Sequence, residues 1–524
     1  MEVCRSELGV DMKLERLTQF NFNSLIHKEI ICYEKSEAYL SELYTAFHLK
    51  HKIRQIIDDN KRNQGTFVFK GDTVVVTDSS CVSQIDFHST AILITSDYFM
   101  EAYEKLCNVP LLKNAVDTIY YFANKETEYE LTYREKYKNA SLKNIIIFRS
   151  GPHASSYVKG MDFADNARAL FEYMLVHGLN ESYELVWLVK NPDEFKQYDH
   201  TNHVKFLSFH WSVSEQEEER DCYYNALCLA KYIFFTDAYG FARNCRKDQI
   251  RIQLWHGCGF KTRVNFIRCE KRYEYTTVIS ELYSKIHQDI YGLREDQMLV
   301  TGYAKQDWLF HPVRNWKDKL GIPRTQKYIF WLPTFRTAKK QLQNLNEYEL
   351  DNQTGLPIVE TYEMLAQLDL LLKSFNIALI LKLHPFQDRD KIGRINMKNI
   401  MMLDNDQLAE KDIQINQLLG HADALISDYS SAAVDYMILD RPIAFTLDDM
   451  EEYEQSRGFV FDHIKEWLPG TELLSFKDLC GFIKEIGEDK DATKEKRREL
   501  TAKMHKYQDD NSCGRIVEAL RIQT

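Results

Sequence analysis

The sequence lacks the cysteine patterns of a zinc-binding or disulfide-stabilised protein. None of its 11 cysteines forms a CxxC pair, and the closest two, Cys222 and Cys228, have no histidines spaced as zinc ligands usually are. A disulfide framework is unusual in a chain of 524 residues, so the cysteines indicate a reducing cytoplasm. We also find no carboxylate pair spaced for an obligatory metal. No cofactor is therefore expected, and a requirement for Mg²⁺ is left open.

Long apolar runs are missing as well. The first 20 residues carry acids and lack the apolar core of a signal peptide. No window approaches the ~18 uninterrupted apolar residues of a membrane-spanning helix. We therefore expect a cytoplasmic chain that is neither secreted by that route nor anchored by a span. Peripheral attachment to the inner face of the cytoplasmic membrane stays open.

An excess of basic residues is the third absence. The chain has 67 Lys and Arg against 78 Asp and Glu, a formal net charge of −11. A protein that coats nucleic acid needs a broad phosphate-neutralising surface, so nucleic acid is excluded as a main partner. One local cationic pocket for a diphosphate remains compatible with this balance.

What the chain does contain is enough apolar sequence, 44%, for two or three packed units. In residues 1–140, apolar runs at 71–77 and 91–96 and a helix from Tyr98 suggest a small βαβ unit without a catalytic signature. Two longer alternations of strand and helix follow, in residues 141–312 and 313–524. Such alternation predicts an α/β fold with parallel sheets covered on both faces, and a ligand cleft between the two units. The expected strands of these units are 144–148, 183–189, 232–236 and 250–255, then 328–332, 377–382, 399–403, 424–427 and 442–446.

The most informative motif follows the strand at 424–427. A short turn leads into a helix that starts near Ser430 and Ser431, where backbone N–H groups and two hydroxyls favour an anion. Asp435 lies one helical turn beyond Ser431, on the same face. An equally supported interpretation is simple helix capping by Asp428 or Ser430.

A second motif, Trp255-His-Gly-Cys-Gly-Phe-Lys261, ends the strand at 250–255. Glycines allow a tight turn or a close approach to a ligand. His256 can accept a proton from an attacking hydroxyl, and Lys261 can neutralise a phosphate. The alternative for His256 is a hydrogen-bonded loop residue. Cys258 is interpreted as a small turn residue rather than a nucleophile.

Three further motifs are weaker. Lys382 and His384 share one face of a strand that Pro385 ends, and a structural histidine is the competing interpretation. Thr334 and Arg336 follow another strand, where a guanidinium suits a phosphate or is merely solvated. Asp307 is interpreted as part of a capped helix. The charged run 494–498 is interpreted as a solvated helix face, with attraction to anionic lipid as the minority alternative.

Taken together and in this order, these motifs resemble the CDP-glycerol glycerophosphotransferase family of teichoic-acid primases, polymerases and capsule enzymes. The resemblance runs from about residue 144 to the end, with Asp165-Asn166 and His505…Arg515 as further echoes. At 304–307 the chain has Ala-Lys-Gln-Asp where the family often has Pro-Arg-x-Asp. The matching boxes are Trp255-His-Gly…Lys261, Thr301-Gly…Asp307, Pro333-Thr-Phe-Arg336, Lys382-Leu-His-Pro385 and Asp428-Tyr-Ser-Ser…Asp435.

The resemblance implies a GT-B-like pair of Rossmann-type lobes after an added N-terminal α/β segment. Residues 141–312 would form the acceptor side, and residues 313–524 would bind a CDP-activated donor. Glycerol phosphate, or another polyol phosphate such as ribitol phosphate, would pass to a hydroxyl of a glycan or lipid-linked acceptor, with release of CMP. His256 becomes the candidate general base and His384 a second catalytic group at the diphosphate. The implied donor-binding residues are Lys261, Thr334, Arg336, Lys382, Ser430, Ser431 and Asp435.

Two alternatives stay open at this point. The same two-lobed frame hosts glycosyltransferases that use nucleotide sugars. A non-catalytic scaffold for glycan assembly is the third hypothesis. The sequence identifies neither the polyol nor the acceptor, and it does not separate a primase from a polymerase.

Overall fold

The computed structural model describes residues 12–523 except 36, 48, 50, 60–63, 87–88, 97, 110–111, 113–115, 152–159, 237–245, 262–271, 334–351, 383–396 and 457. The chain divides into two compact units. Unit 1 consists of Met1–Leu142, Phe209–Leu229 and Gly240–Asp248, and unit 2 contains the remaining residues. The predicted residues Thr334, Arg336 and His384 lie outside the described part of the chain.

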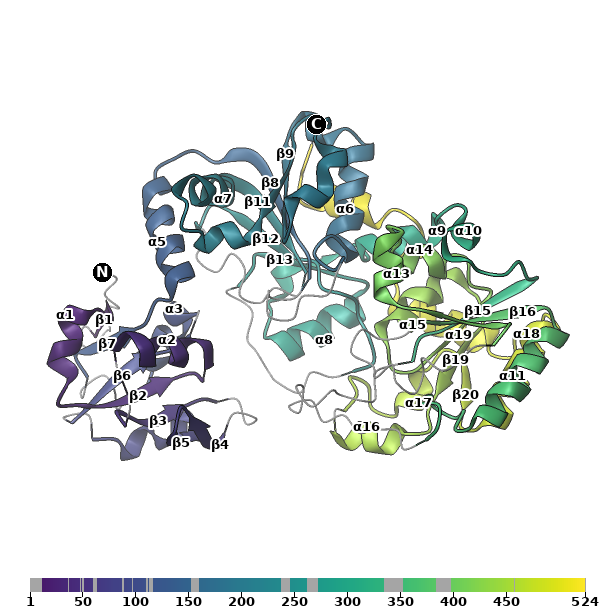
Figure 1. The fold of residues 1–524 in the computed structure, drawn as a ribbon, viewed down its shortest axis with the longest axis horizontal. Helices are drawn as coiled ribbons and strands as arrows, with labels where there is room; N and C mark the ends of the chain where they lie inside the picture. Colours follow the sequence, from purple (N-terminus) through teal and green to yellow (C-terminus); the bar gives the residue numbers. More distant parts are fainter. Residues whose placement is uncertain are drawn as a thin grey trace. The chain divides into compact units, whose positions relative to one another are not determined.

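Unit 1 is built on one mainly parallel sheet (Figure 1). Its strand order is β1-β7-β6-β2-β3-β5-β4, and only the β4–β5 pair is antiparallel among the described pairs. The sheet is larger than the small βαβ unit expected from sequence, although β5, β6 and α3 fall where that unit was predicted. The strands are β1 (Lys13–Arg16), β2 (Glu29–Tyr33), β3 (Ile53–Ile57), β4 (Gly65–Phe69), β5 (Asp72–Thr77), β6 (Thr90–Ile94) and β7 (Thr118–Tyr121), and the helices include α1 (Gln19–Phe22), α2 (Glu37–Phe47), α3 (Phe99–Cys107), α5 (Lys125–Tyr137) and α7 (Glu217–Leu229).

Unit 2 begins with a lobe around a fully parallel sheet of order β10-β9-β8-β11-β12-β13-β14. The run Ile145–Phe148 in β8 is buried on both faces, as expected for a central parallel strand. The strands are β8 (Lys143–Arg149), β9 (Glu184–Val189), β10 (Val204–Ser208), β11 (Ala230–Phe235), β12 (Ile250–Gln253), β13 (Tyr275–Val278) and β14 (Met298–Val300), and the helices include α6 (Asp165–Val176), α8 (Glu281–Tyr291) and α9 (Asp307–Phe310).

The second lobe of unit 2 has another parallel sheet, of order β17-β16-β15-β18-β19-β20. The order reverses direction between β15 and β18, which is where doubly wound sheets bind ligands. The strands are β15 (Lys327–Trp331), β16 (Ile377–Lys382), β17 (Ile400–Leu403), β18 (Ala424–Ser427), β19 (Ile443–Thr446) and β20 (Thr471–Leu473). The helices include α10 (Trp316–Leu320), α11 (Tyr362–Ser374), α13 (Asn405–Glu410), α14 (Ile415–Leu419), α15 (Ser431–Tyr436), α16 (Met450–Ser456), α17 (Ile464–Trp467), α18 (Phe476–Gly487), α19 (Lys494–Met504) and α20 (Ser512–Ala519).

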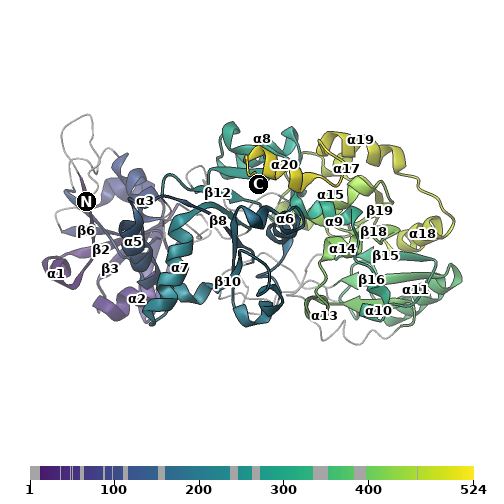
Figure 2. The same cartoon turned by 90° about the horizontal axis from the view of Figure 1, so that it is seen from above.

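The two lobes of unit 2 are joined at several points. Helix α14 of the second lobe lies beside α9 of the first in both views (Figures 1 and 2). The last helix, α20, returns to the first lobe, where Cys513, Ile516 and Leu520 enter the core around β8 and α6. The end of the chain therefore contributes to the core of the first lobe.

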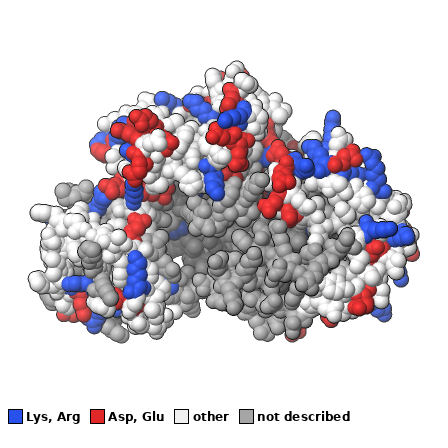
Figure 3. All heavy atoms as spheres, viewed as in Figure 1, with Lys and Arg blue, Asp and Glu red and all other residues white. Residues whose placement is uncertain are grey.

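Sequence and structure agree on the class of fold. The expected GT-B-like pair of Rossmann-type lobes with an added N-terminal α/β segment is confirmed. In the described residues, none of the helices combines the length and the apolar character needed to cross a membrane. Acidic and basic side chains are interspersed over the face shown in Figure 3, in keeping with the modest net charge of −11.

Candidate active site

The turn that carries His256 leaves the carboxyl end of β12. Trp255 has a φ of 51° and Gly257 a φ of 145°, so the backbone turns sharply on both sides of the histidine. The Gln253 side chain stabilises the turn by accepting a hydrogen bond from the Trp255 amide at 3.0 Å. The His256 side chain is 42% exposed at the end of this turn, where a solvent-borne substrate can reach it.

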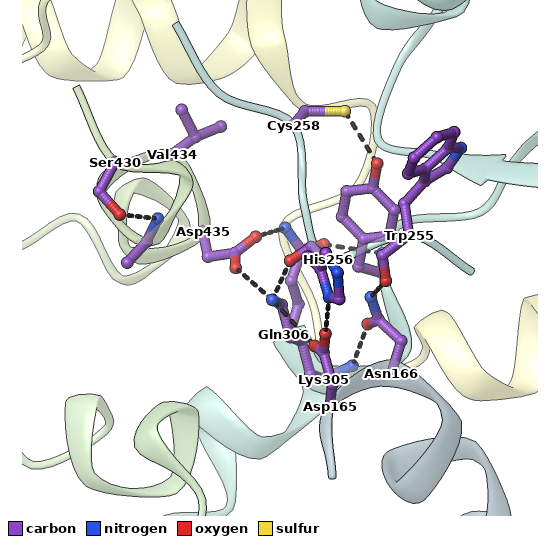
Figure 4. A network of polar contacts seen from close by, with 12 residues as sticks. Asp165, Asn166, Trp255, His256, Cys258, Lys305, Gln306, Ser430, Val434 and Asp435 are labelled. Carbon is purple, nitrogen blue, oxygen red and sulfur yellow. Dashed lines mark hydrogen bonds and ion pairs between the residues drawn. The ribbon is translucent and has the colours of Figure 1, made fainter. Parts of the chain in front are cut away.

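His256 is paired with a carboxylate. Its Nδ1 lies 2.6 Å from Oδ2 of Asp165, the first residue of α6 (Figure 4). The next residue, Asn166, is fully buried and donates from Nδ2 to the carbonyl oxygens of Leu254 and Trp255, at 3.1 and 2.8 Å. The start of α6 is thereby tied to the histidine turn. An imidazole that donates from Nδ1 to a carboxylate presents Nε2 as its proton acceptor.

Lys305 connects the dyad to the second lobe. Its Nζ lies 3.0 Å from Asp165 Oδ1 and 3.7 Å from Asp435 Oδ2, and it donates to the backbone carbonyl of His256. Burial lowers the pKa of Lys305, but the two carboxylates outweigh burial and raise that pKa above its ordinary value. Burial likewise raises the pKa of Asp165, yet the Lys305 ammonium and His256 hold it below its usual range. The structure therefore favours a charged Lys305 beside an ionised Asp165.

The serine-bearing helix α15 packs directly on the histidine turn. A Cβ atom at Gly257 would lie 3.2 Å from both Cβ and Oγ of Ser431, so only glycine allows this approach at its positive φ. Ser430 is the N-cap of α15 and accepts from the Ala432 amide at 3.3 Å. The capping interpretation thus holds for Ser430. The histidine turn contacts the serine pair through Gly257, Gly259 and Ser431.

Asp435 points from α15 toward Gln306 and Lys305 (Figure 4). It is not among the residues that line the neighbouring cavity. Its Oδ1 accepts from Gln306 Nε2 at 2.8 Å, and its side chain is 2% exposed. Burial raises the pKa of Asp435, and Lys305 and Gln306 only partly offset that effect. Because these contacts occupy the carboxylate, Asp435 holds the two lobes together and does not line the cavity beside them.

A cavity of about 410 Å³ lies between the two lobes of unit 2, next to this network. Three lysines contribute to its lining, Lys261, Lys305 and Lys382, together with Asp165 and Ser430. The stretch from α13 to the start of α14 also contributes to the lining. It provides the apolar residues Leu408, Ala409, Ile413 and Ile415 and the polar residues Asn405, Gln414 and Asn416. A cavity lined by both lysines and apolar residues suits a ligand that joins a diphosphate to a less polar group.

The other lysines of the cavity are held by their own contacts. Lys382 is the last residue of β16, is 8% exposed, and donates from Nζ to Asn405 Oδ1. Lys261 forms a backbone bridge with Phe459, and its Nζ lies 5.7 Å from the centre of the Tyr453 ring. The predicted donor-binding residues Lys261, Lys382 and Ser430 thus line one cavity. Ser431 lies between the lining residues Ser430 and Ala432 and packs on the histidine turn.

Two residues of the sequence motifs are structural. Asp307 accepts from the backbone amides of Ser512 and Cys513 at 2.8 and 2.9 Å, and so caps helix α20. Cys258 is buried, with Sγ 3.1 Å from Tyr303 Oη, and burial raises the pKa of its thiol to about 12. A thiol with so high a pKa is a poor nucleophile at neutral pH. In the described part of the chain, His, Cys, Asp and Glu side chains form no group of three or more that could hold a metal ion.

The sequence motifs missed the residues that support His256. Asp165 and Asn166 were noted only as echoes of the family, and Lys305 only as a departure from an arginine. Two features of the sequence could have pointed to these residues. Asp165 and Asn166 form a polar pair at the start of a helix, and Lys305 is a basic residue after the Thr301-Gly302 turn. Neither signal shows that these residues meet His256, which is 91 positions from Asp165 along the chain.

Comparisons with known proteins agree with this architecture. The chain is 26% identical over 335 residues to the teichoic acid ribitol-phosphate polymerase TarK of Staphylococcus aureus, which covers 60% of this chain and 61% of TarK. It is 24% identical over 406 residues to a teichoic acid glycerol-phosphate transferase of the same species, covering 72% of this chain and 93% of the relative. The match to TarK therefore spans less than two thirds of that protein's length.

Among solved structures, the wall teichoic acid polymerase TagF superposes with a TM-score of 0.54 at 19% identity, over 81% of this chain and 97% of TagF. At that identity the likeness establishes the fold alone. The model of the family described as CDP-glycerol:poly(glycerophosphate) glycerophosphotransferase matches residues 143–521. This match covers both lobes of unit 2 and the complete His256 network, and the chain therefore belongs to the CDP-glycerol:poly(glycerophosphate) glycerophosphotransferase family.

Proposed function

We propose that the protein transfers a polyol phosphate, such as glycerol phosphate or ribitol phosphate, from a CDP-activated donor to a hydroxyl of a teichoic-acid-like or capsular polymer. The acceptor oxygen attacks the phosphorus that carries the polyol. A phosphodiester bond forms, the bond from that phosphorus to the bridging oxygen breaks, and CMP leaves with the bonding electron pair. The proton of the acceptor hydroxyl passes to Nε2 of His256.

The observation that carries this proposal is the pairing of His256 with Asp165, a residue that lines one cavity together with three lysines. Phosphoryl transfer needs positioning and charge stabilisation more than covalent chemistry. A general base next to a cationic cavity supplies both requirements. The names of the relatives, which include polymerases and transferases of glycerol phosphate and ribitol phosphate, support the same substrate class. A TagF structure soaked with CDPG supports a CDP-linked donor.

We assign the donor to the second lobe and the acceptor to the first. Lys261, Lys382, Ser430 and Ser431 would contact the diphosphate, since the first three line the cavity and the fourth adjoins it. Thr334, Arg336 and His384 keep the roles that the family resemblance implies, as donor-binding residues and a second catalytic group. Asp435 would act indirectly, by holding Lys305 and Gln306.

We further infer that the protein works in the cytoplasm, in peripheral contact with the inner face of the membrane. A lipid-linked acceptor would be accessible at this membrane face, where the charged lipid headgroups lie in water. This inference depends on the acceptor class and is separate from the chemistry at His256.

The test is release of CMP from CDP-glycerol and CDP-ribitol in the presence of an acceptor polymer. We expect CMP with at least one donor, and a loss of about 10²- to 10⁴-fold in kcat for His256→Ala. His177→Ala is the matched control, because His177 is an exposed histidine at the end of α6 and should keep full activity. Release of UDP or GDP from nucleotide sugars, with no CMP from either CDP-polyol, would overturn the proposal.

A further inference from the structure

Two residues next to the His256 side chain have strained backbones: Trp255, which precedes it in the chain, and Asp165, which contacts it. Trp255 has a φ of 51° and Asp165 a φ of 60°, a left-handed conformation that is unfavourable for a residue with a side chain. Neither is a glycine, and a bulky residue such as tryptophan is rarely found there. Such outliers persist only where surrounding contacts hold them, and they gather at functional sites.

The contacts that hold the backbones of Trp255 and Asp165 also bring the side chains of His256 and Asp165 together. Asn166 Nδ2 donates to the carbonyls of Leu254 and Trp255, while Asn166 Oδ1 accepts from the Lys305 amide at 3.1 Å. The Asp165 amide donates to Gln414 Oε1, on the second lobe, at 3.2 Å. The position of the Asp165 carboxylate is therefore fixed by both lobes before any substrate binds.

Each oxygen of the Asp165 carboxylate has a separate partner. Oδ2 lies 2.6 Å from Nδ1 of His256, and Oδ1 lies 3.0 Å from Nζ of Lys305. A carboxylate that accepts the Nδ1 proton fixes the tautomer in which Nε2 takes up a proton, and it stabilises the imidazolium that results. A buried ammonium on the other oxygen keeps that carboxylate ionised.

We propose that Asp165 is the positioning residue of the reaction, holding His256 in its base tautomer, and that Lys305 keeps Asp165 charged for this task. The inference rests on the proposed function, whose general base it orients. The proton of the acceptor hydroxyl stays on His256 after transfer and then passes to water. Asp165 stabilises the charge without taking the proton itself.

The charged groups around His256 determine how its protonation depends on pH. In the described part of the chain, Asp165 and Lys305 approach it from the first lobe. Asp435 approaches from the second lobe, where its Oδ2 would lie 3.8 Å from a Cβ atom on Gly257. Of these groups, Asp165 is the carboxylate whose hydrogen bond to the imidazole is seen in the structure.

The decisive variant is Asp165→Asn, because asparagine tolerates the left-handed conformation and removes only the charge. We expect kcat for CMP release to fall about 10²- to 10⁴-fold with little change in KM for the donor. The acid limb of the pH–rate profile should move to lower pH, since the protonated imidazole loses its anionic partner. Asp193→Asn is the control, because Asp193 is 77% exposed on the same lobe and should change neither kcat nor the limb.

A second readout does not depend on turnover. Diethyl pyrocarbonate modifies neutral imidazole, so its rate at His256, followed by peptide mass spectrometry across pH, reports protonation directly. In Asp165→Asn, the midpoint of the pH dependence of this modification rate should shift to lower pH. A shifted midpoint without CMP release in the wild-type chain would retain the positioning role and reject the proposed function. Wild-type kcat with an unshifted midpoint would overturn the positioning role alone.

If Asp165→Asn does not fold, Asp165→Gly provides the test, since glycine adopts a φ of 60° without strain. Formate should then restore part of the lost kcat by replacing the missing carboxylate between His256 and Lys305. Acetamide, which is neutral, is the control and should not. A glycine variant with native thermal stability that formate fails to rescue would also overturn the inference.

Discussion

Replacing Lys305 with methionine tests how strongly the buried charges hold unit 2 together. At an effective dielectric constant of 20, separations of 3.0 and 3.7 Å correspond to attractions of about 5 kcal/mol each between Lys305 and the two carboxylates. Most of that attraction offsets the cost of removing the charges from water. Removing one partner of a buried ion pair typically costs about 3–5 kcal/mol, because the remaining charge is left uncompensated.

We therefore expect Lys305→Met to lower the free energy of unfolding of unit 2 by about 3–5 kcal/mol at pH 7–8. The loss should shrink as the pH falls. In wild-type protein, the depressed pKa of Asp165 gives stability that is complete above the unfolded value near 3.8 and is lost as the pH falls through the folded value. Without Lys305 this term disappears, and protonation of Asp165 and Asp435 removes their repulsion. The two stability curves should converge at acid pH.

The measurement is thermal and urea unfolding, followed by tryptophan fluorescence from pH 8 down to about pH 2. The double variant Lys305→Met/Asp435→Asn should recover part of the loss, since one uncompensated carboxylate is gone. Lys196→Met is the control, because Lys196 is 69% exposed and pairs with Asp193 at the surface, so its change should stay within about 0.5 kcal/mol. A Lys305→Met protein as stable as that control, or a loss independent of pH, would refute the reasoning.

Three further predictions concern single side chains of unit 2. Cys258→Ala should keep kcat within a few-fold, because a thiol with a pKa of about 12 is not the nucleophile; abolished CMP release from a folded variant would show the opposite. Asp307→Ala should lower the free energy of unfolding by about 1–2 kcal/mol through loss of the α20 cap, and an unchanged melting temperature would contradict this. Burial lowers the pKa of His505 to about 4, so below its ordinary value of 6.5 the unfolded chain binds a proton that the folded chain does not. The contribution of neutral His505 to the free energy of unfolding is complete above pH 6.5, and it is lost by about 1.4 kcal/mol per pH unit down to pH 4. In urea titrations, His505→Gln should make the free energy of unfolding depend less steeply on pH. An equal slope in both proteins would be inconsistent with the burial of His505.

Local sequence patterns predicted the strands of unit 2 well where apolar residues run continuously. The stretches at 144–148, 377–382 and 424–427 coincide with β8, β16 and β18, because strands buried on both faces need an unbroken apolar run. Less apolar strands such as β10 were missed. Its residues Val204 and Phe206 are only partly buried, and Lys205 interrupts the run.

The charged run at 494–498 is an exposed helix face at every position except one. It was interpreted as a solvated helix face, yet Arg497 is fully buried and pairs with Asp440 and Asp491 at 3.0 and 2.6 Å. A charge is buried only when a partner meets it, and Asp440 comes from a segment 57 positions earlier. Spacing along one helix carries no information about such a distant partner.

Local patterns were enough to predict the class of fold, the order of the motifs and His256 as a candidate base, because strand runs and short boxes are local properties of a chain. Which residues contact His256 follows only from the folded protein. Asp165, Lys305 and Asp435 come from three different elements, and they meet because two sheets bring their carboxyl ends together and Gly257 allows the turn to touch Ser431. The left-handed φ angles at Trp255 and Asp165 depend on that packing, and they cannot be predicted from the residue types.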